Sequence, residues 1–234
     1  RRQRQMCIRD RAEGSLAKVL TPQGESIFRV RISDTQRPGE AFAPMHWTDQ
    51  MSNGGRVNLL PDQTVDPVSG QPAFKNSPCN LAAMEAEWRA FLVCADRPAL
   101  PPVINWTSAR IAGGWLVELA GEGAIDLEGL LPDGERIEAI DRQRGMRRIA
   151  VRDREGRLAA ALYLTRKGDL PSRDWIARQL VSDEQPDTAA LLAARPKVAE
   201  PDKGPTVCVC FNVGAKQIAR AIAGQSFTSV EEVG

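Results

Sequence analysis

Residues 37–47 read Arg-Pro-Gly-Glu-Ala-Phe-Ala-Pro-Met-His-Trp, and residues 65–75 read Val-Asp-Pro-Val-Ser-Gly-Gln-Pro-Ala-Phe-Lys. From Trp47 to Pro78 the chain is rich in Asn, Asp, Gly, Pro and Ser and shows little hydrophobic periodicity. Aperiodic connections of roughly thirty residues are uncommon inside compact domains and are usually functional where they occur. We therefore expect this stretch to be a functional loop.

Polar and aromatic side chains in this loop suit an anionic ligand that also carries an aromatic base. Lys75 offers a point charge with three donors, Asn58 a paired donor and acceptor, and Trp47 an aromatic face or a single N–H. Arg56 can add a bidentate contact to a phosphate. Each residue also has an ordinary interpretation: a tryptophan that packs at a strand end, an asparagine in a turn, a solvated surface lysine.

His46 is the only histidine of the chain. A histidine can bind a metal or transfer protons, but no partner ligands stand near it in the sequence. We therefore interpret His46 as a packing or hydrogen-bonding residue.

Taken together, the two quoted stretches with Asn58 between them resemble the C-terminal dinucleotide-binding domain of bis-molybdopterin-guanine-dinucleotide oxidoreductases, especially the nitrate reductase branch. The resemblance covers residues 14–81 and implies a partial double-psi β-barrel that the chain enters partway. It implies that Asn58 and Lys75 bind bis-molybdopterin guanine dinucleotide, with Trp47 as a weaker third contact. The stretch between Trp47 and Asn58 is longer than in the periplasmic relatives.

A second motif, Gly204-Pro-Thr-Val-Cys-Val-Cys-Phe-Asn-Val-Gly214, precedes a predicted helix over 215–223. Cys208 and Cys210 can bind one iron of a [2Fe–2S] cluster, because such clusters are held by four cysteines. The N-terminal N–H groups of the following helix would favour the thiolates. The alternatives are buried or redox-inert thiols, or a metal site of another kind.

This second motif resembles the bacterioferritin-associated-ferredoxin-like (BFD-like) [2Fe–2S] domain, in which a later Cys-x-x-Cys completes the ligand set. The resemblance implies that Cys208 and Cys210 are cluster ligands in a truncated α-helical domain. The resemblance to the bis-molybdopterin-guanine-dinucleotide oxidoreductases further implies a [4Fe–4S] cluster in domains that precede this chain.

Five segments are expected along the chain. They are residues 1–11, which resemble translated sequencing-adapter DNA and are set aside as non-native; 12–82, the C-terminal part of the dinucleotide-binding domain; 83–181, a small α+β domain; 182–205, a linker with at most a brief helix; and 206–234, the truncated BFD-like domain. The hairpin expected around 147–164 resembles the segment that precedes the same iron–sulfur domain in assimilatory nitrate reductases, and it assigns no catalytic residue.

Local patterns predict the elements of these segments. They are strands over 16–20, 26–33 and 41–45, with Phe28, Val30 and Ile32 on one face; a short helix or strand within 84–100; a hairpin around Asp153–Gly156; a helix capped by Ser172; a helix over 215–223 ended by Gly224; and a second helix from Thr228.

The composition is that of a globular protein, with 42% hydrophobic and 26% charged residues and a formal net charge of +1. Neither nucleic-acid binding nor membrane insertion is expected, since apolar runs such as 111–119 are far shorter than the about 20 residues that a bilayer requires. Five cysteines are too few for a disulfide scaffold. The isolated Cys7, Cys79 and Cys94 are expected to be small buried apolar residues.

The resemblance implies a cytoplasmic enzyme that reduces nitrate, a small anionic substrate, to nitrite with electrons from a reductase or a ferredoxin. No catalytic residue is expected in this chain, which should catalyse nothing alone. Two alternatives stay open. One is a molybdopterin oxidoreductase with another substrate, such as formate, and the other is a non-enzymatic [2Fe–2S] electron-transfer module.

Overall fold

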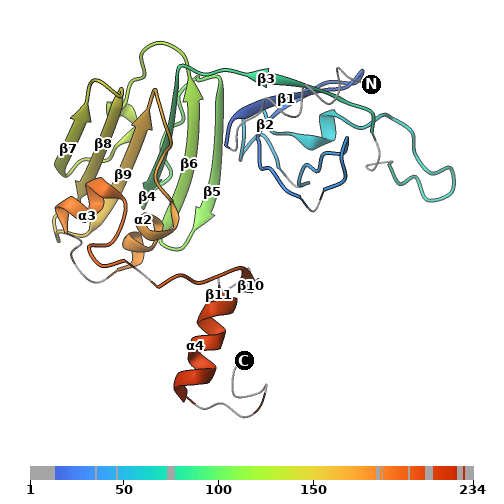
Figure 1. The fold of residues 1–234 in the computed structure, drawn as a ribbon. Coiled ribbons are helices and arrows are strands. Elements are labelled where there is room, and N and C mark those ends of the chain that lie inside the picture. The colour runs from blue at the N-terminus through green and yellow to red at the C-terminus, as the bar shows by residue number, and fades with distance from the viewer. Residues whose placement is uncertain are drawn as a thin grey trace. The chain divides into compact units, whose positions relative to one another are not determined.

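The computed structural model describes residues 14–34, 36–45, 47–72, 77–182, 185, 187–199, 201–208, 213–225 and 229. The chain divides into two compact units, residues 1–194 and 195–234 (Figure 1). The division lies inside the predicted linker 182–205, so the first part of that stretch belongs to the first unit. The predicted non-native segment 1–11 and the start of the predicted second helix at Thr228 lie outside the described residues.

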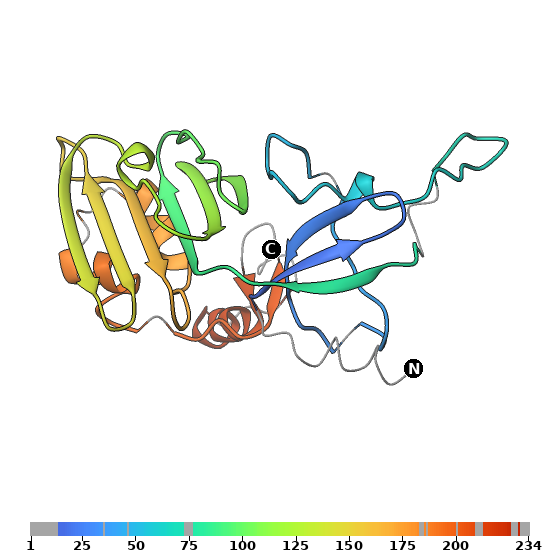
Figure 2. The ribbon, with the colours of Figure 1, turned by 90° about the horizontal axis from the view of Figure 1, so that it is seen from above.

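A three-stranded antiparallel sheet opens the first unit, in the order β2-β1-β3 (Figure 2). Its strands are β1 (Leu16–Leu20), β2 (Glu25–Arg29) and β3 (Asn80–Met84). The turn between β1 and β2 is encoded locally, because the Thr21 hydroxyl accepts the backbone N–H groups of Gln23 and Gly24 at 3.3 and 3.2 Å. The predicted strand 16–20 is confirmed, and the predicted segment boundary at 82/83 falls within β3.

Two strand predictions in this region are wrong. The strand predicted over 26–33 ends at Arg29, and Ile32, which was predicted to share the face of Phe28, is 62% exposed. Residues 41–45 form no strand. Proline cannot donate to a strand ladder, and Pro44 lies in this stretch.

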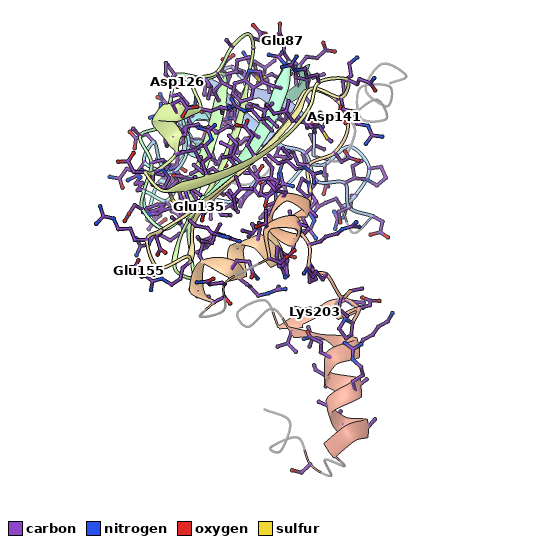
Figure 3. All side chains as sticks on the ribbon, turned by 90° about the vertical axis from the view of Figure 1, so that its left-hand side faces the viewer. Glu87, Asp126, Glu135, Asp141, Glu155 and Lys203 are labelled. Atoms are coloured by element: carbon purple, nitrogen blue, oxygen red, sulfur yellow. The ribbon has the colours of Figure 1, made fainter. Side chains whose placement is uncertain are left out.

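A six-stranded antiparallel sheet follows, in the order β5-β6-β4-β9-β8-β7. Its strands are β4 (Trp88–Cys94), β5 (Asn105–Ile111), β6 (Gly114–Gly121), β7 (Glu135–Asp141), β8 (Met146–Arg152) and β9 (Leu158–Thr165), with a 3-10 turn η2 (Glu128–Leu130) between β6 and β7. Glu135 and Asp141, labelled in Figure 3, mark the two ends of β7 at one edge of the sheet.

The central position of β4 in this sheet explains why the sequence pattern within 84–100 did not distinguish a helix from a strand. Strand β4 pairs with both β6 and β9 and is buried on both faces, so it shows an apolar run without alternation. The predicted hairpin around Asp153–Gly156 is confirmed as β8–β9. In its turn the Asp153 carboxylate accepts the backbone N–H groups of Glu155 and Arg157 at 3.0 and 2.8 Å.

Helices α2 (Asp174–Arg178) and α3 (Thr188–Ala193) cover one face of the six-stranded sheet, and a 3-10 turn, η3 (Gln179–Val181), follows α2 (Figure 1). Ile176 of α2 and Leu191 of α3 are fully buried against Phe91 and Tyr163, whose rings stack at 4.8 Å between centroids. The Tyr163 hydroxyl donates to the carbonyl of Leu191. Burial raises the pKa of this hydroxyl, so it stays protonated and keeps donating. The brief helix of the linker is therefore part of a core.

The predicted cap of α2 is also wrong. The helix begins after Arg173, whose backbone is already helical, and no side chain caps it. The Ser172 hydroxyl accepts only a long 3.4 Å bond from the amide of Asp174. Arg173 instead takes its position from a bidentate pair with Glu118, which the local sequence does not encode.

The second unit contains a two-stranded ribbon, β10 (Thr206–Cys208) with β11 (Val213–Gly214), followed directly by α4 (Ala215–Gln225). The predicted helix 215–223 is confirmed but does not end at Gly224, which lies inside α4. A Cβ at Gly224 would meet nothing, so this glycine marks an exposed helical position rather than a stop.

We expect Leu191→Ala to lower the free energy of unfolding by about 2–5 kcal/mol, because it leaves a cavity beside Phe91 and Tyr163. Leu192→Ala is the matched control, since the neighbouring leucine is only partly buried, and it should cost clearly less. Urea unfolding of the two variants measures the difference. Equal small losses would mean that α3 belongs to a solvated linker.

Candidate functional site

The residues predicted to bind a cofactor lie in a loop whose backbone the two sheets hold. Asn58 is exposed in a single 3-10 turn, η1 (Val57–Leu59), and Trp47 is half-buried at the start of the loop. No hydrogen bond joins these two side chains. Lys75 and His46 lie outside the described residues.

Strand β2 holds one side of the segment that precedes Asn58. The buried Ser26 hydroxyl donates to the carbonyl of Arg56 at 2.6 Å, and the amide of Ile27 donates to the carbonyl of Gly54 at 2.7 Å. A Cβ at Gly54 would lie 3.2 Å from the Ile27 side chain. A glycine therefore permits this close approach of loop and strand.

Strand β5 holds the other side of the same segment. The amide of Ser108 donates to the carbonyl of Met51 at 2.7 Å, the amide of Asn53 donates to the carbonyl of Trp106 at 3.3 Å, and Ser52 forms an antiparallel bridge with Thr107. The loop thus adds a short strand-like stretch to the β5 edge of the six-stranded sheet.

The Asp-Pro-x-Ser motif closes a small loop of its own. The Asp66 carboxylate accepts the amides of Val68 and Ser69 at 3.1 and 2.7 Å and the Ser69 hydroxyl at 2.9 Å. The hydrogen bonds from Ser69 hold the pKa of Asp66 below its usual range, so the carboxylate stays ionised and keeps accepting. A bridge between Val65 and Pro72 ends the loop just before the stretch that contains Lys75. The Asp-Pro-x-Ser motif therefore closes a turn within the longer loop.

Cys208, the first of the two predicted cluster ligands, lies in the ribbon of the second unit. The backbone of Cys208 pairs with Val213, and α4 begins two residues later. The side chain of Cys208 and all of Cys210 lie outside the described residues, so the predicted iron-binding sulfurs are not described.

The expectation that the first N–H groups of α4 point towards a cluster is wrong for two of them. The amide of Ala215 donates to the carbonyl of Pro205 at 2.8 Å, and that of Lys216 donates to the carbonyl of Lys203 at 2.9 Å (Lys203 is labelled in Figure 3). The first amides of a helix have no acceptor within the helix. Here two of them donate to carbonyls of the residues that lead into the ribbon.

Asp202 anchors this approach to α4. Its carboxylate pairs with Lys216 at 2.6 Å and accepts the amide of Gly204 at 2.9 Å, while its carbonyl accepts a hydrogen bond from Arg220 at 2.9 Å. The Lys216 hydrogen bond holds the pKa of Asp202 below its usual range. The ribbon and helix are therefore tied together within the second unit.

Comparisons with known proteins identify the loop region. Residues 9–78 match the family model of the molydopterin dinucleotide binding domain. The chain is also 31% identical over 217 residues, 91% of its length, to a nitrate reductase of Klebsiella oxytoca. Residues 9–78 belong to the molydopterin dinucleotide binding domain family.

Other relatives match a shorter part of the chain. Putative formate dehydrogenases of two Staphylococcus aureus strains, USA300 and NCTC 8325, are 32% identical over 71 residues, 30% of the chain and 7% of each relative. The chain spans about a quarter of the length of the nitrate reductase that it matches, 25%. No solved structure matches.

The described residues fit a dinucleotide with anionic phosphates. Arg56 and Asn58 are exposed, and within the described chain neither the guanidinium nor the amide has a hydrogen bond or an ion pair. The backbone of Arg56 is nevertheless fixed through Ser26. A cation and an amide that are held in place with unused donors are the chemistry that phosphates and a purine edge require.

The remaining thiols and carboxylates show no second site. Among the described residues, no three or more His, Cys, Asp or Glu side chains are grouped to hold a metal ion. Cys94 is buried as expected, which raises the pKa of its thiol to about 12, whereas Cys79 is exposed, contrary to expectation. Cys7 lies outside the described residues. No helix in the described ranges is long and apolar enough to cross a membrane.

Proposed function

We propose that this chain is part of a molybdenum-dependent nitrate reductase that converts nitrate to nitrite. One observation carries the proposal: the similarity to a nitrate reductase covers 91% of the chain, whereas the similarity to putative formate dehydrogenases covers 30%. A match over 91% must include the six-stranded sheet as well as the dinucleotide-binding region. Formate oxidation is the second candidate, supported by the shorter match.

In this proposal Asn58 and Lys75 hold the guanine dinucleotide of bis-molybdopterin guanine dinucleotide, and Trp47 adds a weaker contact. The exposed side-chain amide of Asn58, free within the described chain, supports the role of Asn58. The Asp66 loop, which ends just before Lys75 in the sequence, supports the role of Lys75. The bound cofactor supplies the oxygen-atom transfer. The protein's own part here is to bind the nucleotide end through donors on a fixed backbone.

Cys208 and Cys210 are proposed as two ligands of a [2Fe–2S] cluster that receives electrons from a reductase or a ferredoxin in the cytoplasm. The ribbon supports this role because it brings the backbone of Cys208 next to the start of α4. Two thiolates leave half the sites of such a cluster unfilled, so its remaining ligands must come from elsewhere in the whole protein.

We expect the full-length protein to oxidise a reduced dye when nitrate is added and to release one nitrite for each two electrons. Nitrate and formate are compared on the same preparation, with its molybdenum content measured. Formate-dependent dye reduction without nitrate reduction, in a preparation loaded with molybdenum, would replace the proposed substrate by formate.

We expect Asn58→Ala and Lys75→Ala, each in the full-length enzyme, to lower molybdenum-cofactor content more than thermal stability. Loss of a hydrogen bond to a charged ligand costs roughly 1.5–3 kcal/mol, which is a tenfold or larger loss of affinity. Gln63→Ala, another exposed polar position in the loop, is the control and should keep normal content. Unchanged molybdenum in both test variants would remove these residues from the site.

We expect Cys208→Ser and Cys210→Ser in the full-length protein to abolish the [2Fe–2S] signal in electron paramagnetic resonance and to slow reduction by the physiological donor. Activity with a dye that feeds electrons directly to the molybdenum side should largely survive. Cys79→Ser is the control, because Cys79 is exposed and lies in the other unit. A retained [2Fe–2S] signal in both test variants would make these cysteines structural.

A further inference from the structure

The turn that carries Asn58 has little stability of its own. It is one 3-10 turn of three residues, without a side-chain cap and without a buried residue. Such short turns are not stable in isolation, because their few hydrogen bonds do not offset the loss of backbone freedom. The position of Asn58 must therefore be set by what surrounds the turn, and the segment before it, residues 50–56, is one part of those surroundings.

Asn53 attaches that segment to the six-stranded sheet through both ends of its side-chain amide. Its Nδ2 donates to the carbonyls of Val103 and Ile104 at 3.1 and 3.4 Å, and its Oδ1 accepts the amide of Trp106 at 2.8 Å. These bonds are exposed to solvent, so each is weak alone, but all of them hold one side chain that cannot turn without breaking them together.

Arg97 makes a second attachment from the loop after β4. Its Nη2 donates to the carbonyl of Gln50 at 2.6 Å, and its guanidinium lies over the ring of Trp115 at 4.9 Å from the centroid. Arg110 lies over the same ring at 5.1 Å, but no hydrogen bond joins its described side chain to the loop. Both arginines thus lie over the Trp115 ring, but only Arg97 donates a described hydrogen bond to the loop. Arg110 can therefore serve as the control for Arg97.

The strand on the other side of the segment is tied to the same sheet. Arg29, the last residue of β2, pairs with Glu118 of β6 at 3.0 Å. Segment 50–56 therefore lies between β5 and a strand that is itself attached to β6. Both sides of the segment take their position from the six-stranded sheet.

We infer that the six-stranded module is a positioning scaffold for the cofactor-binding loop, and that Asn53 and Arg97 are its positioning residues. The inference rests on the proposed binding of the dinucleotide at Asn58. It gives residues 88–165, which lie outside the part matched by the dinucleotide-domain model, a role in retaining the guanine nucleotide.

The test uses the full-length enzyme with Asn53→Ala, Arg97→Ala, Arg97→Lys and Arg110→Ala. One measurement is hydrogen exchange at the amide of Leu60, which donates to the carbonyl of Val57 across η1. The other is the amount of guanine nucleotide released by acid from each variant. A thermal melt of the same samples separates local loosening from general unfolding.

Asn53→Ala and Arg97→Ala should speed exchange at Leu60 at least about tenfold and lower the guanine nucleotide content, with a small change in melting temperature. Arg97→Lys should restore most of the content, since it keeps a donor for the Gln50 carbonyl. Arg110→Ala should match the wild type in both readouts.

Unchanged exchange at Leu60 in both alanine variants, or equal effects of Arg97→Ala and Arg110→Ala, would overturn the inference. A wild-type protein without guanine nucleotide would instead refute the proposed cofactor. In that case exchange at Leu60 still decides whether the module positions the loop.

Discussion

The arrangement of the first unit depends on the hydrogen bonds that the carboxylate of Glu118 accepts. It accepts two hydrogen bonds from Arg173 at 2.9 Å each and one from Arg29 at 3.0 Å. The bidentate pair with Arg173 fixes an angle as well as a distance, and the Arg173 guanidinium also lies 4.5 Å from the centroid of the Phe91 ring. Strand β2, strand β6 and the start of α2 therefore meet at one side chain.

The members of this cluster differ in exposure, and this decides what each contributes. The side chains of Glu118 and Arg173 are only 21% and 22% exposed, whereas that of Arg29 is 52% exposed. Exposed ion pairs are screened and contribute little to stability, so the Arg29 contact matters for orientation more than for energy. Arg89 makes a comparable link from β4, donating to the carbonyls of Gly14 and Gly168 at 3.4 and 2.9 Å. Several modest contacts thus hold the small sheet on the large one.

This arrangement explains how a loop without periodic structure can hold the segment next to the proposed binding residue, Asn58. The loop backbone forms hydrogen bonds with β2 and β5, and Gly54 allows it to come close to Ile27 of β2. Binding residues are often on loops that a rigid scaffold positions. Here the scaffold includes a sheet that follows the dinucleotide-binding region in the sequence, which gives the long nitrate reductase match a structural meaning.

Parts of the fold, and the family to which the loop region belongs, could be predicted from the sequence where the signal is complete within a few residues, whereas the roles of the proposed site residues stay predictions. The hairpin turn at Asp153 and the strand Leu16–Leu20 are examples, because their hydrogen bonds and apolar positions are local. The two quoted motifs likewise pointed to the dinucleotide-binding family, since a family pattern is carried by residue order. The placement of the segment before Asn58 was not predictable, because its partners in β2 and β5 lie far along the chain.

Only the tertiary structure decided the features that depend on contacts between residues far apart in the chain. The sequence by itself determined the strand Leu16–Leu20, the hairpin turn at Asp153 and the helix that begins at Ala215. It did not determine that β2 ends at Arg29, that α2 begins after Arg173, or that Leu191 is buried within an expected linker. Each of these depends on a contact with a residue more than 25 positions away, such as Arg173 with Glu118, 55 positions apart, or Leu191 with Tyr163, 28 apart. Such contacts form only once the chain has packed, so no short stretch of sequence encodes them.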